Sequence, residues 1–251
     1  MFAPIKRIID DIGNGLLFLG VVLRTAGTNP WSIHLISEQI WKVSMQSLAT
    51  TAMAGFFVGA IMTVQFTLQV KEFGALGYLG GLATSGTIRE VGPLLIAFML
   101  SGKVGAFTSA ELGTMRVTEQ IDALVTLSTN AFKYLVGPRL IAAVITLPIL
   151  VAIGDTIGIM GGYIVGTRSL GFNSYAYIKT TADFLHLDDV TSGLIKAAVF
   201  GLIIAIMGCY HGFNSKGGAQ GVGRATTNAV VSASILILAA NFALTNLLFT
   251  E

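Results

Sequence analysis

Four ionisable residues of this chain stand inside long apolar stretches, where a charged side chain is costly. Arg89 and Glu90 are neighbours, while Asp155 and Lys196 lie singly in two later stretches. Within a membrane such groups pair with one another or line a wet cavity, and they often mark a substrate path. Two interpretations follow: a cavity that contacts a charged headgroup, or an ion-pair network that only holds helices together.

Sequence patterns of common enzymes are absent. The chain has no G-x-S-x-G, no H-E-x-x-H and no phosphate-binding loop, and three scattered histidines with the lone Cys209 give no metal-ligand spacing. The glycine run at 217–223 follows an apolar stretch rather than a strand, so it predicts a tight turn. A lipid-acting enzyme with Glu90 as general base and Lys196 as its partner is a weaker alternative, because no nucleophile accompanies them. We therefore expect no catalytic residue, metal or cofactor, and any ATP to be bound by another subunit.

Composition determines the class of protein. Of 251 residues, 53% are hydrophobic and only 11% are charged, against about 25% charged in soluble domains. A formal net charge of +2 is too small for a basic nucleic-acid-binding surface. The chain is therefore expected to be an integral membrane protein that does not bind nucleic acid.

Apolar run lengths predict the transmembrane helices that must position the four charges. About 20 helical residues cross the hydrocarbon core, and stretches of this kind occur at 43–70, 87–108, 136–166, 191–213 and 225–250. The segment 73–86 is short and rich in glycine, which favours a turn or a re-entrant stretch. The sequence therefore predicts an all-α protein with five spans.

Residues 1–42 and the loop charges predict how the bundle sits in the membrane. Apolar residues at helical spacing beside Lys6 and Arg7 are typical of an interfacial helix, and Trp31 and Trp41 suit an aromatic belt. Basic residues concentrate on the segments that an inward N-terminus would place inside, nine against three: Lys6, Arg7, Arg24, Lys42, Arg116, Lys133, Arg139, Lys216 and Arg224, against Lys71, Arg168 and Lys179. This bias predicts a cytoplasmic N-terminus and a periplasmic C-terminus.

The inner loop at 109–135 predicts a short helix between spans two and three. Leu112, Met115, Glu119 and Asp122 follow helical spacing and expose charges of both signs. We expect an amphipathic helix over 111–124, parallel to the membrane. Such a helix either caps the bundle or docks into a groove of a cytoplasmic partner.

An ordered series of motifs runs from about residue 40 to the end. The motifs are IREVGPLL at 88–95, GKVGA at 102–106, AELGTMRVTEQIDAL at 110–124, YLVGPR at 134–139 and GGAQGVGRATT at 217–227. In this series the chain resembles the MlaE/YrbE family of ABC-transporter permeases. The resemblance implies one permease domain over 1–251, with an interfacial region at 1–42 and a transmembrane bundle at 43–251.

The resemblance also implies a function and a set of partners. A permease of this family works as a homodimer in the bacterial inner membrane and moves phospholipids to or from a periplasmic MlaD-like MCE-domain protein, which maintains outer-membrane lipid asymmetry. A cytoplasmic MlaF-like ATPase hydrolyses ATP, often with a MlaB-like STAS protein. The alternative is a non-transporting membrane scaffold for the same ATPase and MCE complex. Transport direction and headgroup preference stay open.

The resemblance also implies which residues of this chain bind lipid and which contact the ATPase. The implied lipid-binding residues are Arg89, Glu90, Lys196, Met62, Gln69, Val70, Phe73 and Val91. The implied ATPase-coupling residues are Glu111, Met115, Arg116, Glu119, Gln120 and Asp122. Asn241 stands where some relatives carry an aspartate, which argues against a charge-relay role at that position.

Overall fold

A computed structural model describes residues 13–15, 17–22, 24 and 32–249, and this part of the chain contains helices and turns but no strand. Five helical runs are long and apolar enough to cross a membrane: Ile33–Glu72, Leu76–Val117, Phe132–Ser169, Leu187–Phe213 and Gly218–Leu248. The predicted all-α fold with five spans is confirmed. A shorter apolar helix, Gly13–Val22, precedes them, while residues 1–12 and Trp31 of the predicted interfacial region lie outside the described residues.

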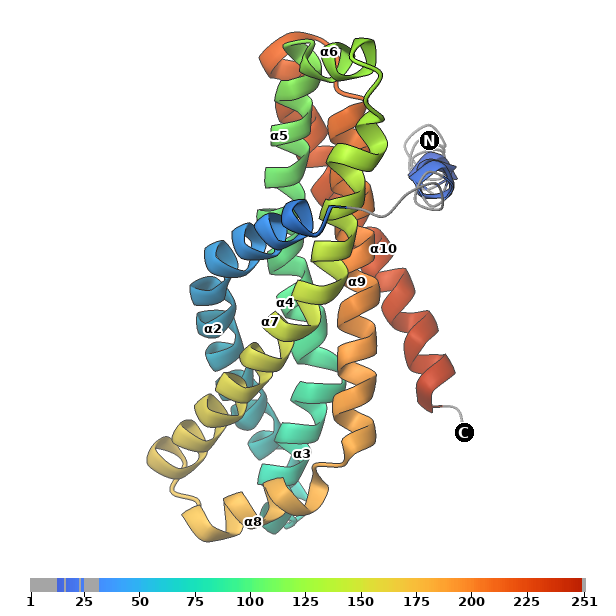
Figure 1. Cartoon of the computed structure of the whole chain (residues 1–251). Helices are drawn as coiled ribbons and strands as arrows, with labels where there is room; N and C mark the ends of the chain where they lie inside the picture. The colour runs from blue at the N-terminus through green and yellow to red at the C-terminus, as the bar shows by residue number, and fades with distance from the viewer. Residues whose placement is uncertain (1–12, 16, 23, 25–31, 250–251) are drawn as a thin grey trace, which may run out of the picture.

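The first two spans are longer than predicted. Helix α2 (Ile33–Glu72) begins ten residues before position 43, and its first turns cross the bundle obliquely (Figure 1). The second run is continuous through six segments: η1 (Leu76–Tyr78), α3 (Leu79–Gly86), η2 (Thr87–Val91), α4 (Gly92–Leu100), η3 (Ser101–Gly105) and α5 (Ala106–Val117). The turn or re-entrant stretch predicted over 73–86 is therefore wrong for most of its length, since only residues 73–75 lie between the two runs.

Glycines in α3 serve packing rather than a turn. Helix α8 (Ser174–Phe184) lies against α3, and a Cβ at Gly80 or Gly81 would overlap the Tyr177 carbonyl oxygen or the Phe184 ring. Asn173 caps α8 by accepting hydrogen bonds from the two N–H groups at 175 and 176. Burial raises the pKa of the Tyr177 hydroxyl, which lies 3.1 Å from Thr63 Oγ1. Close packing thus turns a glycine-rich segment into a helix.

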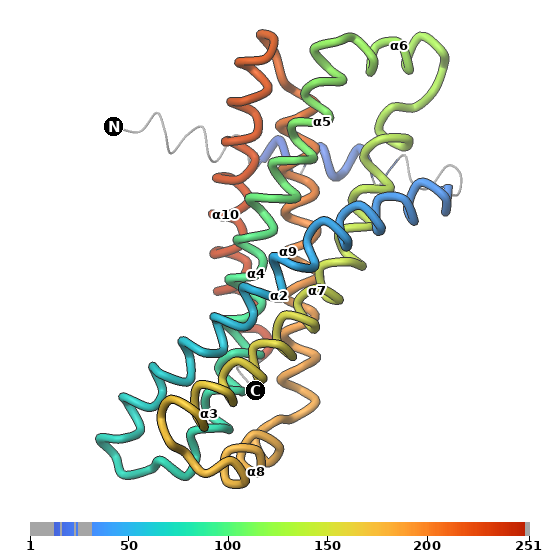
Figure 2. Tube along the Cα trace, turned by 90° about the vertical axis from the view of Figure 1, so that its left-hand side faces the viewer, coloured from blue at the N-terminus to red at the C-terminus, as the bar shows by residue number. Residues whose placement is uncertain are grey.

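The remaining spans follow in sequence. The third run is η4 (Phe132–Val136), α7 (Gly137–Ile164) and η5 (Val165–Ser169), and the last two spans are α9 (Leu187–Phe213) and α10 (Gly218–Phe249). The predicted turn over 217–223 is wrong beyond its first residue, because α10 begins at Gly218. Helix α6 (Gln120–Thr126) lies at one end of the bundle and α8 at the other (Figures 1 and 2). We call these the α6 end and the α8 end.

Two π-helical segments each precede a Gly-Pro pair. Segment η2 runs into Pro93 and η4 runs into Pro138. Proline has no N–H, so the carbonyl four residues earlier loses its α-helical donor. Single π-helical turns inside α-helices are frequent at functional sites, and η2 contains both Arg89 and Glu90.

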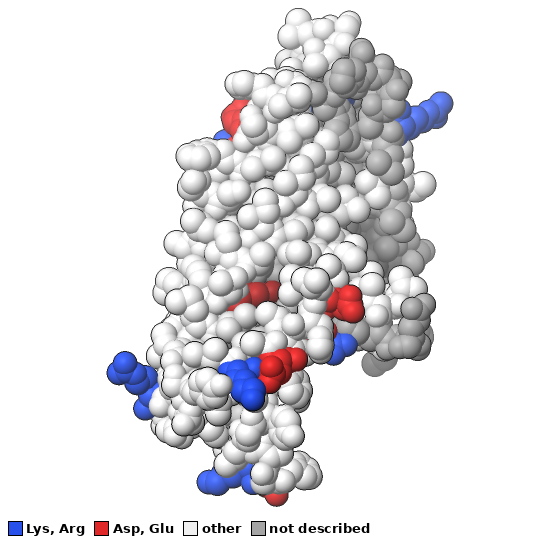
Figure 3. Space-filling view, turned by 60° about the horizontal axis from the view of Figure 1, so that its bottom comes forward, with Lys and Arg blue, Asp and Glu red and all other residues white. Residues whose placement is uncertain are grey.

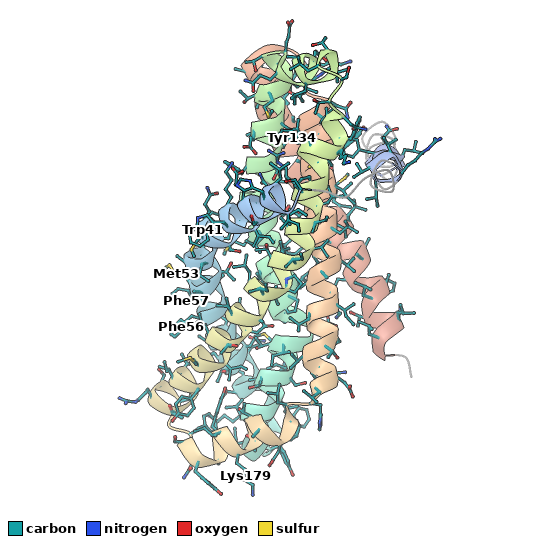
Figure 4. All side chains as sticks on the ribbon, in the orientation of Figure 1. Trp41, Met53, Phe56, Phe57, Tyr134 and Lys179 are labelled. Atoms are coloured by element: carbon teal, nitrogen blue, oxygen red, sulfur yellow. The ribbon has the colours of Figure 1, made fainter. Side chains whose placement is uncertain are left out.

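Glycines also set the closest helix crossing, between α2 and α7. The two helices run side by side in Figures 1 and 2, and a Cβ at Gly55 or Gly59 would overlap the carbonyl of Gly154 or Gly158. Small residues let membrane helices approach in this way. The outer side of α2 presents Trp41, Met53 and Phe57, which project away from the bundle in Figure 4 and are exposed.

Gly59→Ala should destabilise the protein, because the new Cβ would overlap the Gly158 carbonyl oxygen. Overpacking typically costs about 1–3 kcal/mol, so the thermal unfolding midpoint in detergent should fall by several degrees. Gly102→Ala is the matched control, since no atom lies within 4 Å of its added Cβ. A Gly59→Ala midpoint equal to that of the wild type would contradict the close crossing.

Candidate functional site

Lys196 of α9 is the most deeply buried cation in the described part of the chain, with a side chain that is 0% exposed. Its Nζ donates to Glu90 Oε1 at 2.5 Å, to the Arg89 carbonyl oxygen at 3.0 Å and to Thr245 Oγ1 at 2.9 Å. An ammonium has three N–H groups, and three acceptors surround this one. Lys196 therefore joins α9 to η2 and α10.

The Arg89 carbonyl is available to Lys196 for a reason visible in the sequence. Pro93 stands four residues later and has no N–H to donate to that oxygen. Because an unpaired carbonyl inside a membrane costs several kcal/mol, the Lys196 ammonium replaces the missing donor. The proline and the lysine thus form one structural unit.

Glu90 accepts hydrogen bonds from three side chains. Its Oε1 also accepts from Thr245 Oγ1 at 2.8 Å, and its Oε2 accepts from Asn241 Nδ2 at 3.1 Å. We call Glu90, Lys196, Asn241 and Thr245 the Glu90 cluster. The Glu90 side chain is 35% exposed, so the carboxylate is held in place by the protein and still accessible from one side.

The Arg89 side chain belongs to a second polar group. Its Nε lies 3.1 Å from Oδ1 of Asp189, in the first turn of α9. Both residues line a cavity of about 560 Å³ together with His186, Asp188 and Ser192. Figure 3, turned to bring the α8 end forward, shows acidic and basic groups side by side on a largely uncharged surface. The Arg89 guanidinium is thus 39% exposed at this cavity while it pairs with Asp189.

Of the four charges inside apolar stretches, Glu90 and Lys196 pair with each other. Arg89 pairs with Asp189 instead, and Asp155 makes no ion pair in the described part of the chain. Asp155 of α7 is buried against Gly92, where a Cβ would overlap its Oδ1. That oxygen has no hydrogen-bond partner among the described residues. Sequence reasoning missed Asp189 and Thr245, because a first-turn aspartate and an uncharged threonine give no signal of a partner.

The predicted apolar lining is divided between two environments. Val70 is buried, while Gln69 and Phe73 at the end of α2 are exposed. Met62 and Val91 are half-buried, and Met62 Cε lies 3.5 Å from the position of a Cβ at Gly86. Their role in lipid binding stays a prediction.

The predicted coupling helix is broken into two. Helix α5 ends at Val117, Glu119 adopts a left-handed φ of 59°, and α6 begins at Gln120. A single helix over 111–124 is therefore wrong, and the Thr118–Glu119 turn redirects the chain across the end of the bundle. Arg116 Nη1 lies 2.5 Å from Asp122 Oδ1 across this turn. Glu119 and Gln120 are exposed there.

Two of the predicted coupling residues, Glu111 and Met115, make contacts within the bundle, and their coupling role stays a prediction. Glu111 Oε2 accepts from Arg139 Nη2 at 2.6 Å, and its Oε1 lies 3.5 Å from Lys42 Nζ. Arg139 is 9% exposed and also donates to the Leu135 carbonyl at 2.5 Å. We call Lys42, Glu111 and Arg139 the Glu111 cluster. It joins α2, α5 and α7, while Met115 packs against the hydrophobic core.

Comparison with known families matches residues 36–247 to the family model described as Permease MlaE. The chain belongs to the MlaE permease family. A probable ABC transporter permease of Rickettsia typhi is 47% identical over 243 residues, which is 97% of this chain and 94% of that protein. This MlaE-family chain is thus the permease subunit of an ABC transporter, a class in which ATP hydrolysis falls to a separate subunit.

More distant relatives also match most of this chain. A probable ABC transporter permease of Synechocystis is 40% identical over 84% of this chain and 81% of its own length. The chloroplastic protein TRIGALACTOSYLDIACYLGLYCEROL 1 of Arabidopsis thaliana is 32% identical over 99% of this chain and 71% of its own length. The similarity therefore extends across the whole bundle of this MlaE permease.

Lys196→Met should lower the free energy of unfolding by about 3 kcal/mol or more, because Glu90 would keep its charge and lose its counter-ion. Adding Glu90→Gln should restore part of the loss, since the carboxylate is then neutral. Thermal unfolding in detergent measures both, and Lys179→Met on the exposed surface of α8 (Figure 4) is the control. Equal effects of Lys196→Met and Lys179→Met would show that the buried pair does not stabilise the fold.

Proposed function

We propose that this permease moves phospholipids between the bacterial inner membrane and a periplasmic MlaD-like MCE-domain protein, and so maintains outer-membrane lipid asymmetry. It works as a homodimer with a cytoplasmic MlaF-like ATPase, and a MlaB-like STAS protein is a further expected partner. The α6 end faces the cytoplasm in this proposal, which follows the Lys/Arg bias of the loops. The observation that carries the proposal is the Glu90 carboxylate, held by α9 and α10 yet open on one side.

Apolar surface beside the Glu90 cluster supports a lipid as the substrate. Helix α10 supplies Asn241 and Thr245 to the cluster, and its neighbouring side chains Leu238 and Phe242 are exposed. A large exposed apolar surface next to a few fixed polar groups suits a ligand with a polar head and acyl chains. The Arabidopsis relative carries the name of a diacyl glycolipid.

The hydrogen bonds support different roles for the three charged residues. Lys196 already has three acceptors around its ammonium, so it positions Glu90 rather than contacting the lipid phosphate. Arg89 keeps a half-exposed guanidinium at the neighbouring cavity and is the cation that attracts the phosphate. Glu90 then orients the headgroup or repels the phosphate when lipid is released.

Coupling to the ATPase runs through the α6 end. The exposed Glu119 and Gln120 contact the ATPase, with the Arg116–Asp122 pair holding the α5–α6 turn in shape. A push on this turn moves α5, and the Glu111 cluster passes that motion to α2 and α7. ATP binding by the partner would thereby squeeze a cavity at the dimer centre.

A scaffold without transport is the second candidate. The saturated hydrogen bonding of Lys196 is also what a purely structural ion pair would show. In that case the complex would hydrolyse ATP without moving lipid.

Arg89→Gln should lower lipid transport strongly in the reconstituted complex of permease, ATPase and MCE-domain protein. The assay follows ATP-dependent transfer of labelled phospholipid between proteoliposomes and the MCE-domain protein, and a drop of tenfold or more corresponds to loss of at least about 1.4 kcal/mol. Arg168→Gln, an exposed cation at the α8 end, is the control. ATP hydrolysis by the wild-type complex without any lipid transfer would instead support the scaffold.

Glu111→Gln should uncouple hydrolysis from transport, because it removes the carboxylate that joins Lys42 to Arg139. We expect ATPase activity to persist while lipid moved per ATP falls several-fold, with partial recovery in Glu111→Asp. Glu72→Gln, at the exposed end of α2, should leave the ratio unchanged. An unaltered ratio in Glu111→Gln would remove the Glu111 cluster from the coupling path.

A further inference from the structure

A polar cavity of about 490 Å³ lies between the end of α9 and the first turns of α10. Its lining includes His211, Asn214, Ser215, Lys216, Arg224 and Asn228. It lies at the α6 end, where the α9–α10 turn approaches α5 and α6 in Figure 1. It is thus at the opposite end of α9 from the cavity that Arg89 lines.

The charge of this cavity is positive. Lys216 and Arg224 are exposed, neither pairs with a carboxylate in the described part of the chain, and no Asp or Glu is among the described residues that line it. Arg224 Nη2 lies 3.8 Å from the position of a Cβ at Gly217, the residue after Lys216. The guanidinium is therefore folded back over the turn, which brings both cations to the same side.

Further groups around the cavity favour an anion. Ser215 is 5% exposed, and its buried hydroxyl has no hydrogen-bond partner among the described residues. The cavity also faces the N-terminal turns of the 32-residue α10, where the helix dipole and unpaired N–H groups attract negative charge.

The wall of the cavity is fixed by hydrogen bonds rather than loosely packed. Ser232 Oγ donates to the Asn228 carbonyl at 2.7 Å and lies 3.0 Å from His211 Nε2. Because the serine proton is already donated, His211 Nε2 is the donor to Ser232. The ring is thereby held in one orientation, and α9 and α10 are tied together just below the two cations.

The depth of the cavity indicates the source of the anion. Helix α9 has 27 residues and is about 40 Å long, which exceeds the roughly 30 Å of hydrocarbon. Centred on the hydrocarbon core, α9 would extend beyond it at both ends, which places its last turn in the headgroup layer of the leaflet at the α6 end. Basic pockets between transmembrane helices at this level bind anionic lipid headgroups.

We propose that this cavity binds the phosphate of an anionic phospholipid from that leaflet, at a site separate from the Glu90 cluster. Lys216 and Arg224 hold the phosphate, and the acyl chains lie along the exposed surface of α10. A Cβ placed on Gly113 of α5 would lie 3.4 Å from Ser215 Cβ and 3.3 Å from Val222 Cγ1, so α5 packs closely against this turn. A bound lipid would therefore stabilise the turn against which α5 rests.

The test measures phosphatidylglycerol binding to the purified full-length chain by native mass spectrometry. Lys216→Gln/Arg224→Gln should weaken binding roughly tenfold or more, given about 1 kcal/mol for each basic residue near the membrane surface. Arg168→Gln/Lys179→Gln removes two exposed cations from the α8 end and should not change it. Lipid that binds elsewhere on the protein should be the same in the wild type and in both charge-removing variants. The charge-conserving variant Lys216→Arg/Arg224→Lys should retain wild-type affinity.

Each other outcome contradicts the proposal in a defined way. Competition by inorganic phosphate at millimolar concentration, with no preference for phosphatidylglycerol over phosphatidylcholine, would assign the cavity to a soluble phosphate. Unchanged phosphatidylglycerol binding together with lost ATPase assembly would assign it to an acidic segment of the protein partner. Equal binding and equal assembly in both double variants would show that the cavity holds neither.

Discussion

The ammonium of Lys196 is the charge on which the arrangement of this bundle depends. Left unpaired inside the membrane it would cost several kcal/mol, and its acceptors come from two other spans: Glu90 and the Arg89 carbonyl in the second, and Thr245 in the fifth. The same interaction that satisfies the lysine therefore fixes the relative positions of three helices. It also determines how the Glu90 carboxylate is presented, with one side bonded and the other open.

The second span connects the two ends of the molecule. Its continuous helical run carries Glu90 near the α8 end and Glu111 near the α6 end, so each polar cluster is attached to the same element. The π-helical segments η2 and η3 interrupt the regular hydrogen bonding between them. Because π-helical turns inside α-helices are frequent at functional sites, this span combines a continuous connection with two irregular segments. Such a design suits a subunit that receives force at one end and acts at the other.

Much of the fold could be predicted from the sequence, because bilayer thickness restricts spans to long apolar runs. Two of the wrong predictions concern glycine, which favours turns at 73–86 and 217–223 by sequence, yet Gly80, Gly81 and Gly221 lie in helices packed closely against other backbone or side chains. A third is the single helix over 111–124, which breaks at Glu119. The positions of Glu90 and Lys196 inside apolar spans indicated that such charges need partners. They could not supply the uncharged partners Asn241 and Thr245, nor show that Arg89 pairs with Asp189. Those details depend on helix rotation, which the apolar pattern of nearly uniform spans does not encode.

A structure of the transporter complex in lipid nanodiscs tests the central claim most directly, namely that the Glu90 cluster is structural on its Lys196 side and functional on its open side. The account predicts phospholipid density with its headgroup at the open face of Glu90 and within hydrogen-bonding distance of the Arg89 guanidinium, while Lys196 still bonds Glu90. Lipid bound elsewhere in the complex with this region filled by protein side chains, or Lys196 released from Glu90 to contact the phosphate, would contradict it.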